Sequence, residues 1–215
     1  MGLARRMACE MRDAQINRFV LAAFAFEAAL GLGAIVAGLL LAVDPLSSVR
    51  LTENSLADHS KAVIFGVAAT LPLLLGLVIV TRLQFEPFVR LCQFVNERLT
   101  PLFAPLSLFE LAAVSIAAGF GEEILFRGLI QSGLAARLDG TNGVLIALVV
   151  SSILFGVCHW ITPTYGVLAG LAGAYFGLLF IWSGNLLTPL VAHALYDFIA
   201  LAYLTNAERG TGDKK

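Results

Sequence analysis

Three ionisable residues lie close together in a stretch of the chain that is otherwise apolar. Glu122, Glu123 and Arg127 belong to the segment GEEILFRG, and Glu110 is the only other formal charge between positions 106 and 126. Each charge at the middle of a bilayer costs roughly 2.5 to 3.5 kcal/mol on insertion scales, so this cluster costs about 7 to 10 kcal/mol before any pairing. Such a cost indicates side chains that neutralise one another or carry out chemistry.

The spacing of the cluster separates its two acids. In an α-helix, Glu123 and Arg127 form an i, i+4 pair on one face, whereas Glu122 points about 140° away from Arg127. Arg127 can therefore neutralise Glu123 and leave Glu122 unpaired. An unpaired carboxylate away from water holds a proton more readily than one in water, as a general base must. The alternative is an ion network that only holds helices together, but the second Glu would then need a partner of its own.

One candidate partner is His159, at the end of another apolar segment. Glu122 lies 18 residues before the turn at Gly140, and His159 lies 19 residues after it. If the two segments form a helical hairpin, both side chains lie about 27 to 29 Å from the turn. We therefore expect them to meet at one depth.

His193 and Asp197 form a second candidate group, because they are an i, i+4 pair in the last apolar segment. Measured from the turn at Asn185, they lie roughly 10 to 15 Å short of the depth of Glu122. A helix tilt, a protruding hairpin or a break at Pro189 would have to account for this difference.

The composition places these residues in a membrane protein. The 215 residues are 59% hydrophobic and 13% charged, and the mean hydropathy is +0.86. These values predict a polytopic helical membrane protein. A net charge of -1 gives no electrostatic footprint for nucleic acid. The three cysteines share no metal or redox spacing, and their odd number argues against a disulfide framework.

The predicted fold is all-α, a bundle of about six transmembrane helices with one amphipathic helix at the membrane interface. The expected spans are 19–43, 61–82, 106–138, 144–160, 165–182 and 186–204. Charged and apolar residues alternate at helical spacing over 85–99, which predicts the interfacial helix. Polar turns are expected at 44–60, with His59 solvated, at 139–143 and at 183–185. Glycines at 166, 170, 173 and 177 predict a helix-packing face.

These elements divide the chain into four parts. An N-terminal segment (1–18) precedes two spans and the interfacial helix (19–105), a core of four spans that holds the candidate residues (106–204) and a flexible tail (205–215). Placing the N-terminus inside puts ten Lys and Arg residues on the cytoplasmic side and three outside, so both termini and the tail are predicted to be cytoplasmic. The alanine-rich chain has no organellar targeting segment, which favours a prokaryotic inner membrane.

Three short motifs on separate spans resemble those of a known family. They are Glu-Glu-x-x-x-Arg at 122–127, Phe-x-x-x-His at Phe155 and His159, and His-x-x-x-Asn/Asp at His193 and Asp197. In this order they resemble the motifs of the CPBP intramembrane proteases, also called Abi. That family includes the type II CAAX prenyl endopeptidases and bacteriocin-processing or self-immunity proteins. The resemblance covers about residues 106–203.

The resemblance implies hydrolysis of a peptide bond in a protein or peptide at the membrane, with lipid modification of the substrate left open. It implies that Glu122 activates a water molecule with the help of His159, and that His193 and Asp197 bind the developing oxyanion or orient a partner. Glu123, Arg127 and Phe155 would support them. The family often has Asn where this chain has Asp197, so Asp197 is either protonated or serves to orient His193.

A metal ion is a further possibility. Glu122, His159 and His193 could form a catalytic zinc site with an open position for water, as in a metalloprotease. However, the sequence has no His-Glu-x-x-His helix, and a metal-free glutamate mechanism is equally compatible with the residues, so we favour chemistry without zinc.

Two other classes of function use the same residues. A proton-coupled transporter or channel would employ the Glu, His and Asp side chains as a relay, and a non-catalytic relative would act as a scaffold or immunity protein. A transporter predicts inverted repeats, and none is visible in the sequence. The protease is therefore the favoured hypothesis.

Overall fold

The computed structural model describes residues 2–49, 55–138 and 140–212, which form helices joined by turns, without a strand. The α-helices are α1 (Gly2–Leu41), α2 (Ser55–Arg82), α3 (Glu86–Phe94), α4 (Thr100–Phe103), α5 (Leu108–Glu123), α6 (Ser132–Ala135), α7 (Gly140–Cys158), α8 (Pro163–Ser183) and α9 (Leu187–Gly212). The remaining elements are a 3-10 turn, η1 (Ser47–Val49), and two π-helical segments, η2 (Val95–Leu99) and η3 (Ile124–Gln131).

The described helices confirm an all-α polytopic membrane bundle. Five of them are long and apolar enough to cross a membrane: α1 from Arg18, α2 from Leu56, α7, α8, and α9 to Asn206. The bent pair Glu86–Phe103 and Leu108–Ala135, whose parts meet at 111°, makes a sixth when it is counted as one span. Large apolar side chains lie exposed on the outside of the bundle, as in Leu40 and Phe109, each 83% exposed, which suits contact with lipid.

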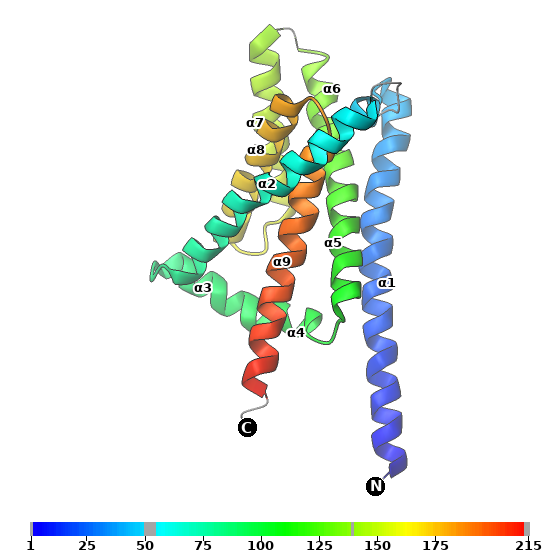
Figure 1. The fold of residues 1–215 in the computed structure, drawn as a ribbon, viewed down its shortest axis with the longest axis vertical. Helices are drawn as coiled ribbons and strands as arrows, with labels where there is room; N and C mark the ends of the chain where they lie inside the picture. The colour runs from blue at the N-terminus through cyan, green and yellow to red at the C-terminus, as the bar shows by residue number, and fades with distance from the viewer. Residues whose placement is uncertain (1, 50–54, 139, 213–215) are drawn as a thin grey trace.

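The continuous helical segment 108–135 lies inside the bundle and organises it. Figure 1 shows α5 between α1 and α9, and η3 carries the segment on against α7. Its start is encoded locally: Ser107 caps α5 and forms a capping box with Glu110. The charge of Glu110 therefore stabilises the start of α5. Glu122, Glu123 and Arg127 lie farther along the segment and take no part in this cap.

Two glycines let neighbouring helices approach α5 on different faces. A Cβ on Gly119 would lie 2.9 Å from the Cβ of Ala194 on α9. A Cβ on Gly121 would collide with the backbone carbonyl of Glu27 on α1. The sequence AAGFGEE therefore brings α9 and α1 against α5 immediately before the two acids. The four glycines of α8 are likewise confirmed as a packing face, since Gly166, Gly170, Gly173 and Gly177 all approach α7 or its flanking residues closely.

We expect Gly119→Leu to force α5 and α9 apart. The added side chain overfills the contact with Ala194, which typically costs about 1–3 kcal/mol, and it displaces the residues of α9 that face α5. Gly33→Leu is the matched control, because a Cβ on Gly33 meets nothing within 4 Å. Thermal unfolding in detergent should show a lower Tm for Gly119→Leu alone, and equal Tm values for both variants would contradict the tight crossing.

Several predicted boundaries shift. The turn expected at 139–143 is shorter, since α7 already begins at Gly140; Asp139 lies outside the described residues. The segment 85–99 continues through α4 and meets the next helix at 111°, so it runs across the direction of that helix. The last helix extends beyond the expected residue 204 to Gly212, so most of the segment 205–215 is helical, and Pro189 lies in the first turn of this helix rather than at a break.

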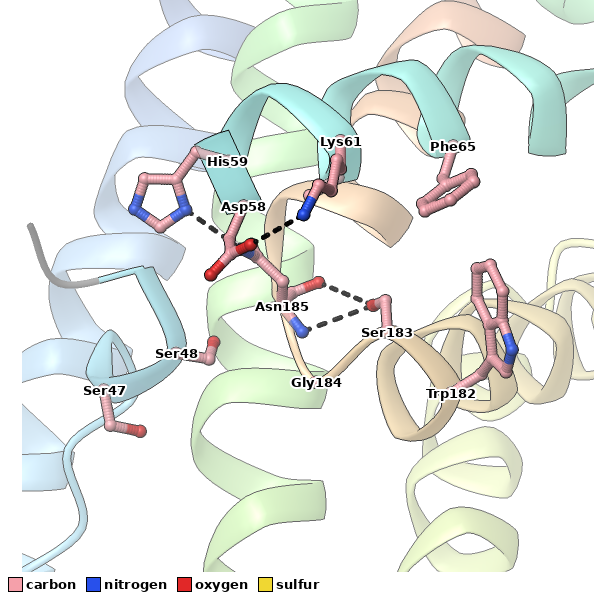
Figure 2. Close-up of a pocket in the computed structure, with 11 residues that line it drawn as sticks. Ser47, Ser48, Asp58, His59, Lys61, Phe65, Trp182, Ser183, Gly184 and Asn185 are labelled. Carbon is pink, nitrogen blue, oxygen red and sulfur yellow. Dashed lines mark hydrogen bonds and ion pairs between the residues drawn. The ribbon is translucent and has the colours of Figure 1, made fainter. Parts of the chain in front are cut away.

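His59 is not the loop residue that the sequence suggested. It lies in the first turns of α2, and its Nδ1 accepts a hydrogen bond of 2.9 Å from the side-chain amide of Asn185. Figure 2 shows this contact at a polar pocket, with the Asp58–Lys61 ion pair on the same helix and the α8–α9 turn opposite. The hydrogen bond between His59 and Asn185 attaches α2 to the α8–α9 turn. In this turn Gly184 adopts the left-handed conformation that ends α8.

Candidate active site

A fully buried ion pair forms the base of the site. Arg127 Nη1 donates a hydrogen bond of 2.7 Å to Glu123 Oε1, and both side chains are 0% exposed. Arg127 Nη2 donates to the carbonyl oxygen of Gly173 at 2.7 Å, which ties the pair to α8. The i, i+4 pairing expected from the sequence is confirmed.

Aromatic rings surround the guanidinium group. Its carbon lies 4.8 Å from the ring centroid of Phe155, 5.3 Å from that of Phe176 and 5.9 Å from that of Phe126. The same rings support the histidines: His159 stacks on Phe155 at 4.4 Å, and His193 stacks on Phe176 at 4.7 Å. The rings of Phe155 and Phe176 therefore pack against Arg127, and each also stacks on one of the two imidazoles.

Glu122 stands apart from this ion pair, as the helix geometry predicted. Its Oε1 lies 3.6 Å from His159 Nε2, and its Oε2 lies 3.9 Å from His193 Nε2. Oε2 is buried and has no hydrogen-bond partner among the described residues. Glu122 and His159 thus meet at one depth, as the hairpin argument required, and the carboxylate faces two imidazoles without being neutralised by Arg127.

The backbone and Glu123 orient the two histidines. His159 follows the last residue of α7, and its Nδ1 lies 2.8 Å from the carbonyl oxygen of Phe155. A carbonyl only accepts, so Nδ1 of His159 carries the proton and Nε2 is free toward Glu122. His193 Nδ1 lies 2.9 Å from Glu123 Oε1, and this carboxylate likewise requires a proton on Nδ1.

Asp197 is the outermost member of the group. Its Oδ2 lies 3.5 Å from His193 Nε2, too far for a direct hydrogen bond, and its side chain is 30% exposed. His193 therefore has a carboxylate at each ring nitrogen, an arrangement that suits an imidazolium with both nitrogens protonated. This geometry favours Asp197 as a residue that orients His193.

The depth difference that the sequence left open for His193 is absent from the structure. Figure 1 shows the α6–α7 hairpin extending beyond the α8–α9 turn, so the two turns used as reference points lie at different levels. The protruding hairpin, one of the three explanations considered, accounts for the difference.

The zinc ligands considered from the sequence, Glu122, His159 and His193, lie close together in the structure. No group of three or more His, Cys, Asp or Glu side chains in the described part of the chain is placed to hold a metal ion. Glu123 is already engaged by Arg127 and His193, and Nε2 of His193 is directed toward two carboxylates.

Comparison with known proteins agrees with the motifs. Residues 104–199 match the family model of the type II CAAX prenyl endopeptidase Rce1-like proteins. The chain carries an Rce1-like segment. Proteins of this family are typically proteases acting on proteins or peptides at the membrane, and some members are non-catalytic. The Rce1-like segment contains every residue of the site described above.

One curated relative also matches. A stretch of 101 residues is 27% identical to the uncharacterized protein YpbD of Bacillus subtilis (strain 168), and it covers 46% of this chain and 47% of the relative. The chain thus spans about half the length of that relative. No solved structure matches the chain.

Three features of the site escaped the sequence analysis. Glu122 and Glu123 end α5 where the chain changes to the π-helix η3, a local widening that is frequent at functional sites but has no sequence signature. Phe176, on which His193 stacks, was not among the residues predicted for the site. Glu27, which lies outside the Rce1-like segment, interacts electrostatically with Glu122, His193, His159 and Asp197.

Proposed function

We propose that the protein is an intramembrane endopeptidase in which Glu122 activates a water molecule. The observation that carries this proposal is the unneutralised carboxylate of Glu122, held 3.6 and 3.9 Å from two histidines whose orientations are fixed by Phe155 and Glu123. An ion network with a purely structural role would pair Glu122, as it pairs Glu123.

In the proposed reaction, Glu122 first accepts a proton and later donates it. Glu122 accepts a proton from a water molecule bound beside His159, and the resulting hydroxide adds to the carbonyl carbon of the scissile peptide bond. His193, as an imidazolium, donates a hydrogen bond to the carbonyl oxygen as negative charge develops there. Glu122 then gives the proton to the amide nitrogen, the C–N bond breaks, and the products are a carboxylic acid and an amine.

The proposed substrate is a CAAX-type or bacteriocin-type peptide held at the membrane, with lipid modification of the CAAX type at its cysteine. The type II CAAX prenyl endopeptidase description of the matched family supports this class. We further propose a prokaryotic inner membrane with both termini in the cytoplasm. The beginning of α1 and the end of α9 lie at the same end of the bundle, which is compatible with an even number of crossings (Figure 1).

The test is cleavage of a fluorogenic farnesylated peptide with two aliphatic residues after its modified cysteine, by the full chain purified in nanodiscs. We expect release of the C-terminal tripeptide, with less than about a twofold loss after dialysis against a zinc chelator, because the site lacks a three-ligand metal set. The unmodified peptide is the control for the role of the lipid. If neither peptide nor a bacteriocin-type leader peptide is cleaved, the enzyme proposal is wrong and a non-catalytic role takes its place.

A further inference from the structure

Glu27 is an acid in an otherwise apolar span. It is the only charged residue between positions 19 and 43, and at mid-bilayer a charge costs roughly 2.5 to 3.5 kcal/mol on insertion scales. It belongs to neither the Rce1-like segment nor the capping and pairing described so far. Its presence therefore calls for an explanation within the fold.

The packing of α1 brings Glu27 to the site. A Cβ on Gly31 would lie 3.4 Å from the Cα of Gly121, so the two helices cross with their backbones in close approach. The backbone carbonyl of Glu27, one turn earlier on the same face, lies against Gly121. Gly121 directly precedes Glu122. The carboxyl group of Glu27 interacts electrostatically with all four members of the Glu122–His159–His193–Asp197 group.

A groove opens from this point toward the outside of the bundle. It has a volume of about 350 Å³, and besides Glu27 its lining includes Phe24, Ala28 and Leu32 of α1 and Ile116 and Phe120 of α5. The four larger apolar side chains are between 46% and 63% exposed, so the groove is accessible from the lipid side. Its volume falls within the range of about 300–1,000 Å³ found for small-ligand sites.

Glu27 lines this groove with one carboxylate oxygen that has no hydrogen-bond partner in the described part of the chain. Its Oε2 is buried and accepts no hydrogen bond from the described residues. A buried acceptor without a donor is unfavourable, and an apolar groove supplies none. An occupant that matches the groove therefore has an apolar side chain for the walls and a hydrogen-bond donor for Glu27. An extended peptide offers both, since every residue except proline carries a backbone N–H.

We propose that the groove between α1 and α5 is a substrate subsite, in which an apolar side chain next to the scissile bond packs on its walls while Glu27 accepts a hydrogen bond from the substrate backbone. This inference rests on the proposed endopeptidase function and adds to it a binding residue from outside the Rce1-like segment. The groove is linked to the site through Gly121, which lines it and directly precedes Glu122, and through Glu27, which interacts electrostatically with Glu122.

The first test compares two substitutions of Glu27 with the farnesylated peptide. Glu27→Leu removes the acceptor, so we expect KM to rise about tenfold with kcat changed less than about threefold. Glu27→Gln keeps a carbonyl acceptor, so its KM should stay close to that of the wild type. Equal losses in both variants, or an unchanged KM in Glu27→Leu, would overturn the proposed hydrogen bond.

The second test fills the groove. Ala28→Phe places a ring among the lining residues, and Ala29→Phe, on a neighbouring exposed position outside the lining, is the matched control. We expect a raised KM for Ala28→Phe alone, and a shift in preference toward peptides with smaller residues after the cysteine. Equal kinetics of the two variants would mean that the groove does not bind substrate.

The third test separates this inference from the proposed activity. In Glu122→Gln, p-benzoylphenylalanine in place of Leu32 should crosslink the peptide, and Ala28→Phe should abolish the crosslink. A crosslink without any cleavage by the wild type would leave the subsite standing and refute the endopeptidase. Cleavage by the wild type without a crosslink, or a crosslink to phospholipid only, would refute the subsite and leave the endopeptidase standing.

Discussion

Glu122→Gln is expected to lower kcat by about 10²–10⁴-fold, the contribution usually made by a positioned general base. The amide has nearly the same size as the carboxylate but cannot take a proton from water. Glu122 makes no contact shorter than 3.6 Å with the histidines and does not share in the Glu123–Arg127 pair, so its replacement leaves the buried network intact. The measurement is kcat for the farnesylated peptide together with the Tm of the purified variant.

Glu123→Gln is the neighbouring control. It changes the same type of side chain one position later, but Glu123 accepts from Arg127 and His193 and is 0% exposed. Its main effect should therefore be a lower Tm, whereas Glu122→Gln should keep the Tm of the wild type. Full activity of Glu122→Gln would show that the base has been assigned wrongly, whatever the behaviour of Glu123→Gln.

The part of the site that could be predicted from the sequence depends on regular helix geometry. The angle between successive residues separated Glu122 from Arg127, and the constant rise per residue placed Glu122 and His159 at one depth on either side of the turn at Gly140. Both inferences need only one helix or one hairpin. They hold in the structure, where Glu122 and His159 lie 3.6 Å apart, although the π-helical segment η3 lies between them.

Longer-range relations could not be obtained in this way. The depth of His193 was measured from the turn at Asn185, whereas that of Glu122 was measured from the turn at Gly140. The sequence does not show how far one of these turns protrudes beyond the other. His193 and Glu123 meet because Gly119 lets α9 approach α5, a tertiary contact between residues 75 positions apart, from 119 to 194. The approach of Glu27 to the site could not be predicted either, since the helix that packs against 19–43 cannot be inferred from local spacing. The stacking of His193 on Phe176 depends in the same way on how α8 packs against α9.

Arg127→Met is expected to destabilise the protein by about 3–5 kcal/mol, because it leaves the fully buried Glu123 without its cation. The guanidinium also bridges to Gly173 and fills the space between Phe155 and Phe176, so α8 loses an attachment to η3. Methionine retains much of the volume, which limits the cavity. Reversible unfolding in mixed micelles with increasing SDS measures the change in the free energy of unfolding.

The chain supplies a control with the same pairing geometry at the surface. Arg90 Nε donates to Glu86 Oε1 at 2.7 Å, also at i, i+4 spacing, but these side chains are 74% and 67% exposed. Arg90→Met should therefore change the free energy of unfolding by less than about 0.5 kcal/mol, since water screens the charge that remains. The double variant Glu123→Gln with Arg127→Met should be more stable than Arg127→Met alone, because no unpaired charge stays buried. If Arg127→Met and Arg90→Met were equally stable, the Glu123–Arg127 pair would not be the base on which the site is built.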